Sequence, residues 1–387
     1  MPDNSNTTKF DDIRPYHDEE MPTIVEKLLE DPQFKAVVNA AFPNIQWENF
    51  KTMLRTFKTP YELQSKFIKD QIFSFAKKTS EKIDCNGFQN IPKNQACTYI
   101  SNHRDIVLDA LLLNAMLLKE GFMTTEVAIG DNLLIYPWLE SIVRMNNNFI
   151  VKRGASIHQK LENSKHLSQY IHFAVKQKQH SIWIAQREGR AKNSDDRTQE
   201  SIIKMLAMGG QNDFLQNIKS LNITPLSISY EFDPCDYLKA KEYQMKRDDP
   251  NFKKTPMDDE INMLTGLKGF KGKIHFQVGR PINSKLQKIN PDLNRNKVAT
   301  EIASLIDHEI FTNYKLYPIN YIAYDKLWGN RPQKNKYTPE EKKETEQYFV
   351  DRINKIDLVN KDVPFLTEKL LEMYAYPVKN QLNANEQ

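Results

Sequence analysis

The sequence is poor in the residues that mark several common kinds of site. Its three cysteines, Cys85, Cys97 and Cys235, are scattered through 387 residues and form no C-x-x-C pair. This spacing predicts neither a disulfide framework nor a zinc site, and it fits a reducing cytosol. The chain has 12 glycines and no G-x-G-x-x-G, so no glycine-rich nucleotide loop is predicted.

Long apolar runs and a strong excess of one charge are also missing. The most apolar stretch, residues 106–118, contains Asp109 and Asn114 and is shorter than the roughly 18 residues of a membrane-spanning helix. The first 20 residues are polar and acidic, unlike a signal peptide. A formal net charge of +4 argues against a dedicated nucleic-acid binder. We therefore expect a cytoplasmic protein that attaches at most peripherally to the inner face of the cell membrane.

Residues 1–85 and 291–387 are predicted to be helical extensions. In the first, Thr59-Pro60-Tyr61-Glu62 is typical of a helix start. It opens a basic amphipathic helix over residues 59–78, which either lies on a membrane or packs its aromatic face on the main domain. The packed arrangement is the more ordinary of the two. In the second extension, Thr338-Pro339-Glu340-Glu341 repeats the same start signal.

Residues 86–290 alternate short β-rich runs with helical stretches. The predicted strands are ACTYIS (96–101), TEVAIG (125–130), NFIVK (148–152), SIWIAQ (181–186), ITPLSISY (223–230) and KIHFQVG (273–279). This alternation predicts an α/β domain, in which a largely parallel or mixed central sheet is flanked by helices. Active sites of such domains gather at the carboxyl ends of the strands.

The stretch SNHRDIVLDALLLN (101–114) places His103 just after a predicted strand and before an apolar helix. It is not the H-R-D loop of a kinase, because Ala110 stands where that loop requires asparagine and no D-F-G follows. A histidine at this place can act as a general base when a carboxylate fixes its tautomer. Asp105 and Asp109 are the two nearby carboxylates that could be this partner.

Cationic residues follow two more of the predicted strands. Lys152 and Arg153 end NFIVKR, and Glu188, Gly189 and Arg190 follow SIWIAQ. Arginines at strand ends facing a histidine and a carboxylate suit a phosphate beside a base. The histidines 158, 166, 172 and 180 lack carboxylates at ligand spacing, so we predict helix-surface positions and no metal.

In these blocks the sequence resembles the glycerolipid acyltransferases of the phosphate acyltransferase superfamily, which make lysophosphatidate and phosphatidate. SNHRDIVLD is similar to the family's N-H-x4-D, FIVKR to F-[IV]-x-R, AQREGRAK to F-P-E-G-[TG]-R, and ITPLSISY to V-P-[VI]. The resemblance covers about half of the chain, in the family's order. This chain departs from the pattern in two places. Five residues separate His103 from Asp109 where the family usually has four, and Gln186-Arg187 replaces Phe-Pro.

The resemblance implies an O-acyltransferase. His103 would deprotonate an acceptor hydroxyl that attacks an acyl thioester, and Asp109 would orient His103. The implied substrate-binding residues are Lys152, Arg153, Glu188, Gly189, Arg190 and Pro225, the last shaping a wall of the cleft. The implied donor is acyl-CoA or acyl carrier protein, with no metal or other cofactor. No acyl-enzyme on a cysteine is expected.

The implied acceptor is 1-acylglycerol-3-phosphate, and glycerol 3-phosphate and a lyso-aminolipid remain open. A lipid product implies contact with a membrane surface, for which the 59–78 helix is a candidate. The rival interpretation is a non-catalytic membrane-surface protein that retains the fold.

Overall fold

The computed structural model describes residues 8–91, 95–290, 292–329 and 332–386. Its centre is a seven-stranded sheet in the order β1-β7-β6-β2-β5-β3-β4. The strands are β1 (Lys82–Asn86), β2 (Thr98–Ser101), β3 (Glu126–Gly130), β4 (Asn148–Val151), β5 (Ile182–Ala185), β6 (Ile223–Tyr230) and β7 (Lys273–Val278). The pairings are parallel except β6 with β7. The predicted α/β fold with a mixed sheet is therefore confirmed.

All six predicted strands are present, and β1 was not foreseen. Its sequence KIDCN is half-exposed and carries charges, so it lacks the apolar run that marks the interior strands. It pairs in parallel with β7 at the edge of the sheet. Since β1 crosses residue 85, the first residues of the sheet come from the region predicted as a helical extension. The proposed division at residues 85 and 290 stays a prediction.

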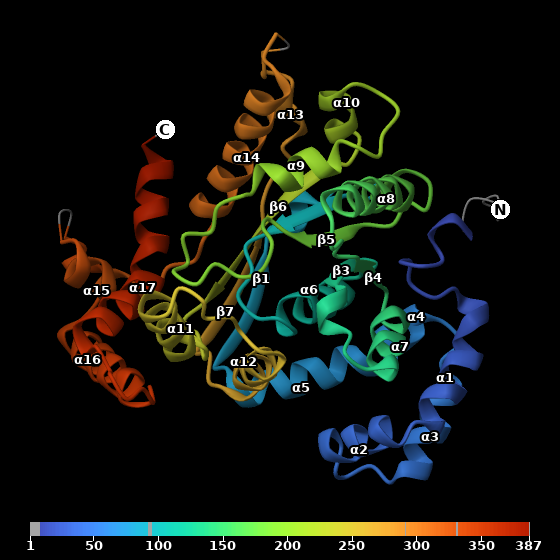
Figure 1. Ribbon diagram of the computed structural model, residues 1–387, viewed down its shortest axis with the longest axis horizontal. Coiled ribbons are helices and arrows are strands. Elements are labelled where there is room, and N and C mark those ends of the chain that lie inside the picture. Colours follow the sequence, from blue (N-terminus) through green and yellow to red (C-terminus); the bar gives the residue numbers. More distant parts are fainter. Residues whose placement is uncertain (1–7, 92–94, 291, 330–331, 387) are drawn as a thin grey trace.

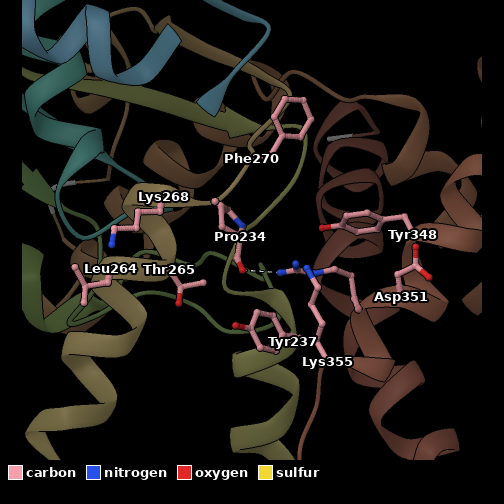
Figure 2. Close-up of a pocket in the computed structure, with 11 residues that line it drawn as sticks. Pro234, Tyr237, Leu264, Thr265, Lys268, Phe270, Tyr348, Asp351 and Lys355 are labelled. Carbon is pink, nitrogen blue, oxygen red and sulfur yellow. Dashed lines mark hydrogen bonds between the residues drawn. The ribbon is translucent and has the colours of Figure 1, made fainter. Parts of the chain in front are cut away.

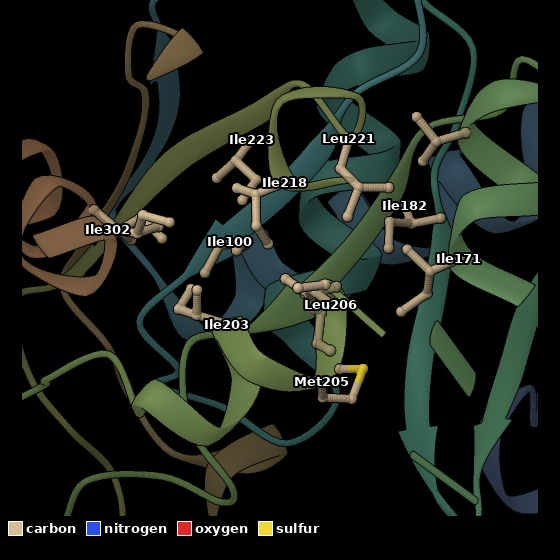
Figure 3. Packing of buried hydrophobic residues seen from close by; sticks show 14 of the residues in the cluster. Ile100, Ile171, Ile182, Ile203, Met205, Leu206, Ile218, Leu221, Ile223 and Ile302 are labelled. Atoms are coloured by element: carbon tan, nitrogen blue, oxygen red, sulfur yellow. The ribbon is translucent and has the colours of Figure 1, made fainter. Parts of the chain in front are cut away.

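Helices cover both faces of the sheet (Figure 1). The helices packed around the sheet include α5 (Lys69–Thr79), α6 (Leu108–Lys119), α7 (Pro137–Met145), α8 (Ile157–Lys176), α9 (Glu200–Leu206), α10 (Phe214–Lys219) and α14 (Arg295–Thr312). The interior strands are apolar on both sides, because successive side chains of a strand point to opposite faces. In β5, Ile182 and Ile184 join the core under α8, α9 and α14, whereas Trp183 joins the core under α5 and α6. Figure 3 shows the first of these cores, where β2, β5 and β6 meet the helices.

The N-terminal and C-terminal helices form two further cores. The N-terminal helices are α1 (Met21–Glu30), α2 (Pro32–Ala41), α3 (Trp47–Thr56) and α4 (Pro60–Leu63), followed by the π-helical segment η4 (Gln64–Ile68). The C-terminal group contains α11 (Asp236–Asp248), α15 (Pro318–Leu327), α16 (Pro339–Asn354) and α17 (Val363–Asn385), with α12 (Pro256–Lys268) and α13 (Asn283–Leu286) between α11 and α14 in the chain. Both predicted helix starts are confirmed: Thr59 accepts a hydrogen bond from the backbone of Glu62, and Thr338 forms a capping box with Glu341.

The predicted helix over residues 59–78 packs its apolar face inward. Phe67 and Ile68 lie against the N-terminal core, and Ile72, Phe73 and Phe75 lie against the core under α5 and α6. The packed arrangement is therefore the correct one of the two alternatives. Within the described residues, no helix is long and apolar enough to cross a bilayer.

Candidate active site

The predicted site residues lie at the carboxyl edge of the sheet. Strands β2, β3, β4, β5 and β6 run in one direction, so the loops that follow them leave at the same edge. His103 comes two residues after β2, Arg153 two residues after β4, and Arg187 two residues after β5. The topology therefore gathers the three motif loops on one side of the sheet.

His103 forms a hydrogen bond with Asp109 at the start of α6. Its Nδ1 lies 2.8 Å from Oδ2 of Asp109, whose side chain is fully buried. The same Oδ2 accepts hydrogen bonds from the backbone N–H of Arg104, at 2.6 Å, and of Asp105, at 3.1 Å. A carboxylate with two fixed backbone donors is held in place. It fixes which nitrogen of the imidazole carries the proton.

Asp105 has a different role, which resolves the alternative left open by the sequence. Its Oδ1 accepts hydrogen bonds from the backbone N–H of Val107, at 2.9 Å, and of Leu108, at 2.8 Å. Burial, and after it the charge of Asp109, raises the pKa of Asp105. Asp105 therefore caps the first turn of α6, and Asp109 is the partner of His103.

Four contacts hold the histidine loop on the sheet. The side-chain amide of Asn102 donates to the carbonyl of Ile228 and accepts from its N–H, both at 2.8 Å. The indole N–H of Trp183 donates to Oγ of Ser101, at 3.0 Å. The Trp183 ring also contacts the imidazole of His103, with centroids 5.5 Å apart. The loop is thus joined to both neighbouring strands, β6 and β5.

Arg104 and Tyr230 lie next to the His103–Asp109 pair, and their contacts could not be predicted from the sequence. Arg104 is buried, donates to Oγ of Ser194 at 2.6 Å, and forms an ion pair with Asp196. Burial alone would lower the pKa of Arg104, but the Asp196 carboxylate raises it. Tyr230 ends β6, and burial together with the Asp109 charge raises its pKa well above the usual value. Both residues therefore keep their ordinary charge next to the His103–Asp109 pair.

The structure separates Lys152 from Arg153. Lys152 donates to Oδ2 of Asp12 at 2.6 Å, which turns its ammonium toward the N-terminal segment. Arg153 is exposed and lies 3.4 Å from the Glu188 carboxylate, so the loops after β4 and β5 meet there. Its backbone N–H donates to Asp131 at 3.0 Å. Of the two cations predicted to bind a phosphate, Arg153 is the one that remains at the loop cluster.

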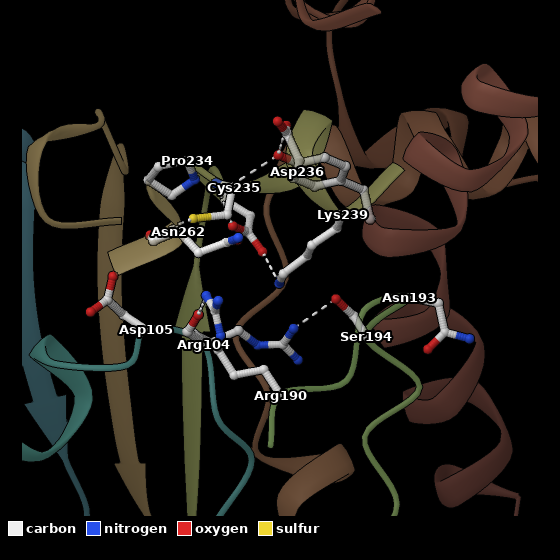
Figure 4. Close-up of polar contacts among 12 residues, drawn as sticks. Arg104, Asp105, Arg190, Asn193, Ser194, Pro234, Cys235, Asp236, Lys239 and Asn262 are labelled. Carbon is white, nitrogen blue, oxygen red and sulfur yellow. Dashed lines mark hydrogen bonds and ion pairs between the residues drawn. The ribbon is translucent and has the colours of Figure 1, made fainter. Parts of the chain in front are cut away.

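Arg190 points into a buried polar cluster rather than into solvent (Figure 4). Its guanidinium donates to the carbonyl of Arg104 at 3.2 Å. Burial lowers its pKa, but Cys235, Asp233 and Asp105 outweigh that effect and raise it. Arg190 therefore supports the backbone of the histidine loop. Gly189, directly before it, is exposed and has a φ of 67°, a conformation that favours glycine.

Pro225 lies within the sheet and not at its edge. It pairs with Ile100 of β2, and β6 is flanked on its other side by β7. Pro225 is the third residue of β6 and is therefore close to the start of the strand, one of the positions that suit a proline. Its carbonyl accepts from the N–H of Gly279 at 2.8 Å, and the β7 ladder begins at the next residue, Leu226. A missing N–H is tolerated here because the β7 pairing starts only after the proline.

The four central histidines do not share one environment. His158 is exposed, as predicted. His166 is half-buried and contacts Asp12 at 3.0 Å. The prediction of surface positions was wrong for His172, which is buried in α8 against the carbonyl of Leu206. It was also wrong for His180, which follows α8 and contacts the buried carboxylate of Glu126. The contact of His172 joins α8 to α9, and the contact of His180 joins the segment after α8 to β3.

The geometry of the site allows His103 to act as a general base. Nε2 of His103 has no hydrogen-bond partner among the described residues, and the imidazole is 15% exposed. A neutral imidazole with a held carboxylate on one nitrogen and a free second nitrogen can take a proton from a hydroxyl. The nearby thiol of Cys235 is a poor nucleophile, because burial raises its pKa to about 11.

Residues 82–228, from β1 to the sixth residue of β6, match the model of the protein family described as Acyltransferase. A comparison with curated proteins gives no match. Among solved structures, the chain is similar to the 1-acyl-sn-glycerophosphate (LPA) acyltransferase PlsC from Thermotoga maritima. The identity is 12% and the TM-score 0.36, over 75% of this chain and 95% of that chain. The segment that carries His103 and Asp109 thus matches an acyltransferase domain over less than half of the chain, and the protein is an acyl-transferring enzyme.

Proposed function

We propose that this enzyme moves a fatty acyl group from an acyl thioester to a hydroxyl of a glycerophospholipid precursor, 1-acylglycerol-3-phosphate. The observation that carries the proposal is the His103–Asp109 pair at the carboxyl end of β2, where Nε2 of His103 has no partner among the residues that the structure describes. The name of the PlsC enzyme gives 1-acyl-sn-glycerophosphate as the acceptor of that enzyme. The match to the acyltransferase family includes these residues.

In this reaction one atom, Nε2 of His103, acts first as the base and then, once protonated, as the acid. Nε2 of His103 takes the proton of the acceptor hydroxyl as its oxygen attacks the thioester carbonyl. The carbon–sulfur bond then breaks, and the leaving thiolate takes that proton back from the imidazolium, so protons balance over the cycle. Asp109 stabilises the transient imidazolium while remaining ionised. A thioester is reactive enough for this sequence, so we propose no metal and no redox cofactor.

The acceptor phosphate would be held by Arg153, with Arg187 as the second cation. Arg153 is exposed at the junction of the β4 and β5 loops, and a phosphate there would compete with Glu188 for its guanidinium. Arg187 is half-buried in the loop after β5. The acyltransferases that the sequence resembles have a proline at this position. A planar guanidinium binds phosphate oxygens in pairs. Lys152 and Arg190 would act indirectly, because both are engaged with protein groups.

The donor would be acyl-CoA or acyl carrier protein. Because the proposed acceptor and product are lipids, the enzyme would work at a membrane surface from the cytoplasmic side. The remaining candidates are glycerol 3-phosphate or a lyso-aminolipid as acceptor, and a non-catalytic protein that keeps the fold.

A panel of acceptors tests the proposal. Purified enzyme is given one long-chain acyl-CoA together with 1-acylglycerol-3-phosphate, glycerol 3-phosphate or a lyso-aminolipid, and acylated products are identified by mass spectrometry. We expect the highest kcat/KM with 1-acylglycerol-3-phosphate. A clear preference for an acceptor without a phosphate would contradict the assignment of Arg153. Transfer to no acceptor, from acyl-CoA or from acyl carrier protein tested in its place, would refute the proposal.

A further inference from the structure

A cavity of about 540 Å³ lies outside the motif loops, between α12 and α16 at the beginning of α11 (Figure 2). Its walls combine apolar and cationic groups. The apolar part includes Leu264 of α12, Phe270 and Tyr348 of α16, and the cationic part is Lys268, Arg352 and Lys355. Because α11 follows β6, the cavity is on the same edge of the sheet as His103.

Helix α12 separates this cavity from the catalytic loop. On one side, a Cβ at Gly266 would lie 2.4 Å from Oδ2 of Asp105, and Asn262 accepts from the Cys235 thiol through its carbonyl. This side touches the loop that holds His103. On the other side, Met257, Ile261 and Leu264 fall at helical spacing and are 61%, 43% and 42% exposed. Phe270, just after the helix, is 53% exposed. The outer side of α12 is thus an apolar stripe in solvent.

Two of the three cations beside the stripe have no counterion in the part of the chain that the structure describes. Arg352 is tied to Asp236 and to the carbonyl of Pro234. Lys268 and Lys355 are exposed, and no described residue forms an ion pair or hydrogen bond with either ammonium. Among the described lining residues, the single carboxylate is that of Asp351, which accepts from the Gln347 amide at 2.9 Å. The three cations Lys268, Arg352 and Lys355 outnumber the two carboxylates, Asp236 and Asp351, so the described groups leave one positive charge in excess at the cavity.

We propose that the cavity binds the phosphate head group of an anionic glycerophospholipid in a bilayer, with the stripe of α12 in the acyl layer. Unpaired ammonium groups beside exposed apolar side chains match the two parts of such a lipid. The other candidate for membrane contact, the helix over residues 59–78, packs its apolar face in the protein. This site is separate from the acceptor site of the proposed function, and binding to it requires no acyl transfer.

Vesicle flotation with the full chain tests the proposal. The vesicles are phosphatidylcholine with or without phosphatidylglycerol, and the variants are Lys268→Gln/Lys355→Gln and Met257→Ser. Each lysine at an anionic surface contributes about 1 kcal/mol, so the double variant should partition about 25-fold less onto the anionic vesicles. Met257→Ser should weaken binding to both kinds of vesicle, by about fivefold.

Matched controls come from the opposite edge of the sheet. Lys119 and Lys176 are exposed at the ends of α6 and α8, and Met123 is 61% exposed, the same fraction as Met257. Lys119→Gln/Lys176→Gln and Met123→Ser should bind as the wild type does. Flotation does not depend on catalysis. The flotation experiment can therefore support lipid binding even if the acceptor panel refutes the proposed function, and the acceptor panel can support that function even if flotation shows no binding.

Three outcomes would overturn the proposal. The wild type could fail to bind anionic vesicles, or the control variants could lose as much binding as their counterparts. Inorganic phosphate at constant ionic strength could abolish vesicle binding, which would show a site for a soluble anion instead of a lipid. Unchanged flotation with phosphate, together with selective loss in the α12 and α16 variants, would support it.

Discussion

Nδ1 of His103 lies 2.8 Å from Oδ2 of Asp109, although the loop between them is one residue longer than in the acyltransferases that the sequence resembles. The extra residue is taken up in the turn at residues 106–107, directly before α6. Asp105 caps that turn through two backbone N–H groups. The longer spacing therefore does not separate the base from its carboxylate.

The first prediction concerns this carboxylate. Asp109→Asn should lower kcat by about 10³-fold or more, because an amide at this place favours the wrong imidazole tautomer. Asp105→Asn is the matched control, since asparagine can still cap the turn. Steady-state kinetics with acyl-CoA and 1-acylglycerol-3-phosphate measures both. Equal losses of kcat in two variants of unchanged thermal stability would contradict the assignment of roles.

The second prediction separates two adjacent cations. Arg153→Ala should raise the KM for a phosphate-bearing acceptor by about 10-fold to 100-fold, because a charge-assisted hydrogen bond is lost. Lys152→Ala should change this KM much less, because Lys152 is paired with Asp12. The KM for acyl-CoA serves as the internal reference. A larger effect at Lys152 than at Arg153 would show that the ion pair with Asp12 opens during binding.

The third prediction concerns the buried ion pair of Arg104 and Asp196. Arg104→Met should lower the free energy of unfolding by about 3 to 5 kcal/mol, because it leaves the Asp196 carboxylate buried without its partner. The double variant Arg104→Met/Asp196→Leu should recover much of that loss. Urea denaturation measures both, with Arg197→Ala as a surface control, since Arg197 is 57% exposed. A double variant as unstable as the single one would contradict this account.

The fourth prediction concerns pH and Glu126, a buried carboxylate at the start of β3. Burial raises its pKa, but Lys178 and His180 outweigh that effect and lower the pKa to about 2. Since this is below the ordinary value of 4.5, the ionised form stabilises the fold above pH 4.5, and the contribution is lost as the pH falls toward 2. Its size is roughly 3 kcal/mol.

Glu126→Gln removes this contribution. The difference in unfolding free energy between wild type and variant should be largest near neutral pH and should shrink steadily below pH 4.5. Urea titrations at several pH values measure it. A difference that does not change with pH would show that the carboxylate contributes by shape and hydrogen bonding and not by its charge.

The sequence predicted the parts of the fold that depend on local patterns. Interior strands such as β5 and β6 are apolar on both faces, so their runs stand out, whereas the half-exposed edge strand β1 has no such run. The order of the motif loops also placed His103 and Arg153 at one edge of the sheet. Contacts between distant segments could not be foreseen: Lys152 meets Asp12 across 140 residues, and Arg104 meets Asp196 across 92. Such pairs leave no periodic signal in one sequence.

The rate of acyl transfer in His103→Ala tests the central claim most directly. Wild type and variant are compared with one long-chain acyl-CoA and 1-acylglycerol-3-phosphate, at equal concentrations of folded protein. Without the base at Nε2, kcat should fall by about 10² to 10⁴-fold, while circular dichroism and thermal stability stay close to those of the wild type. A His103→Ala variant that keeps full activity would contradict the account, because no proton acceptor assigned here would then be needed.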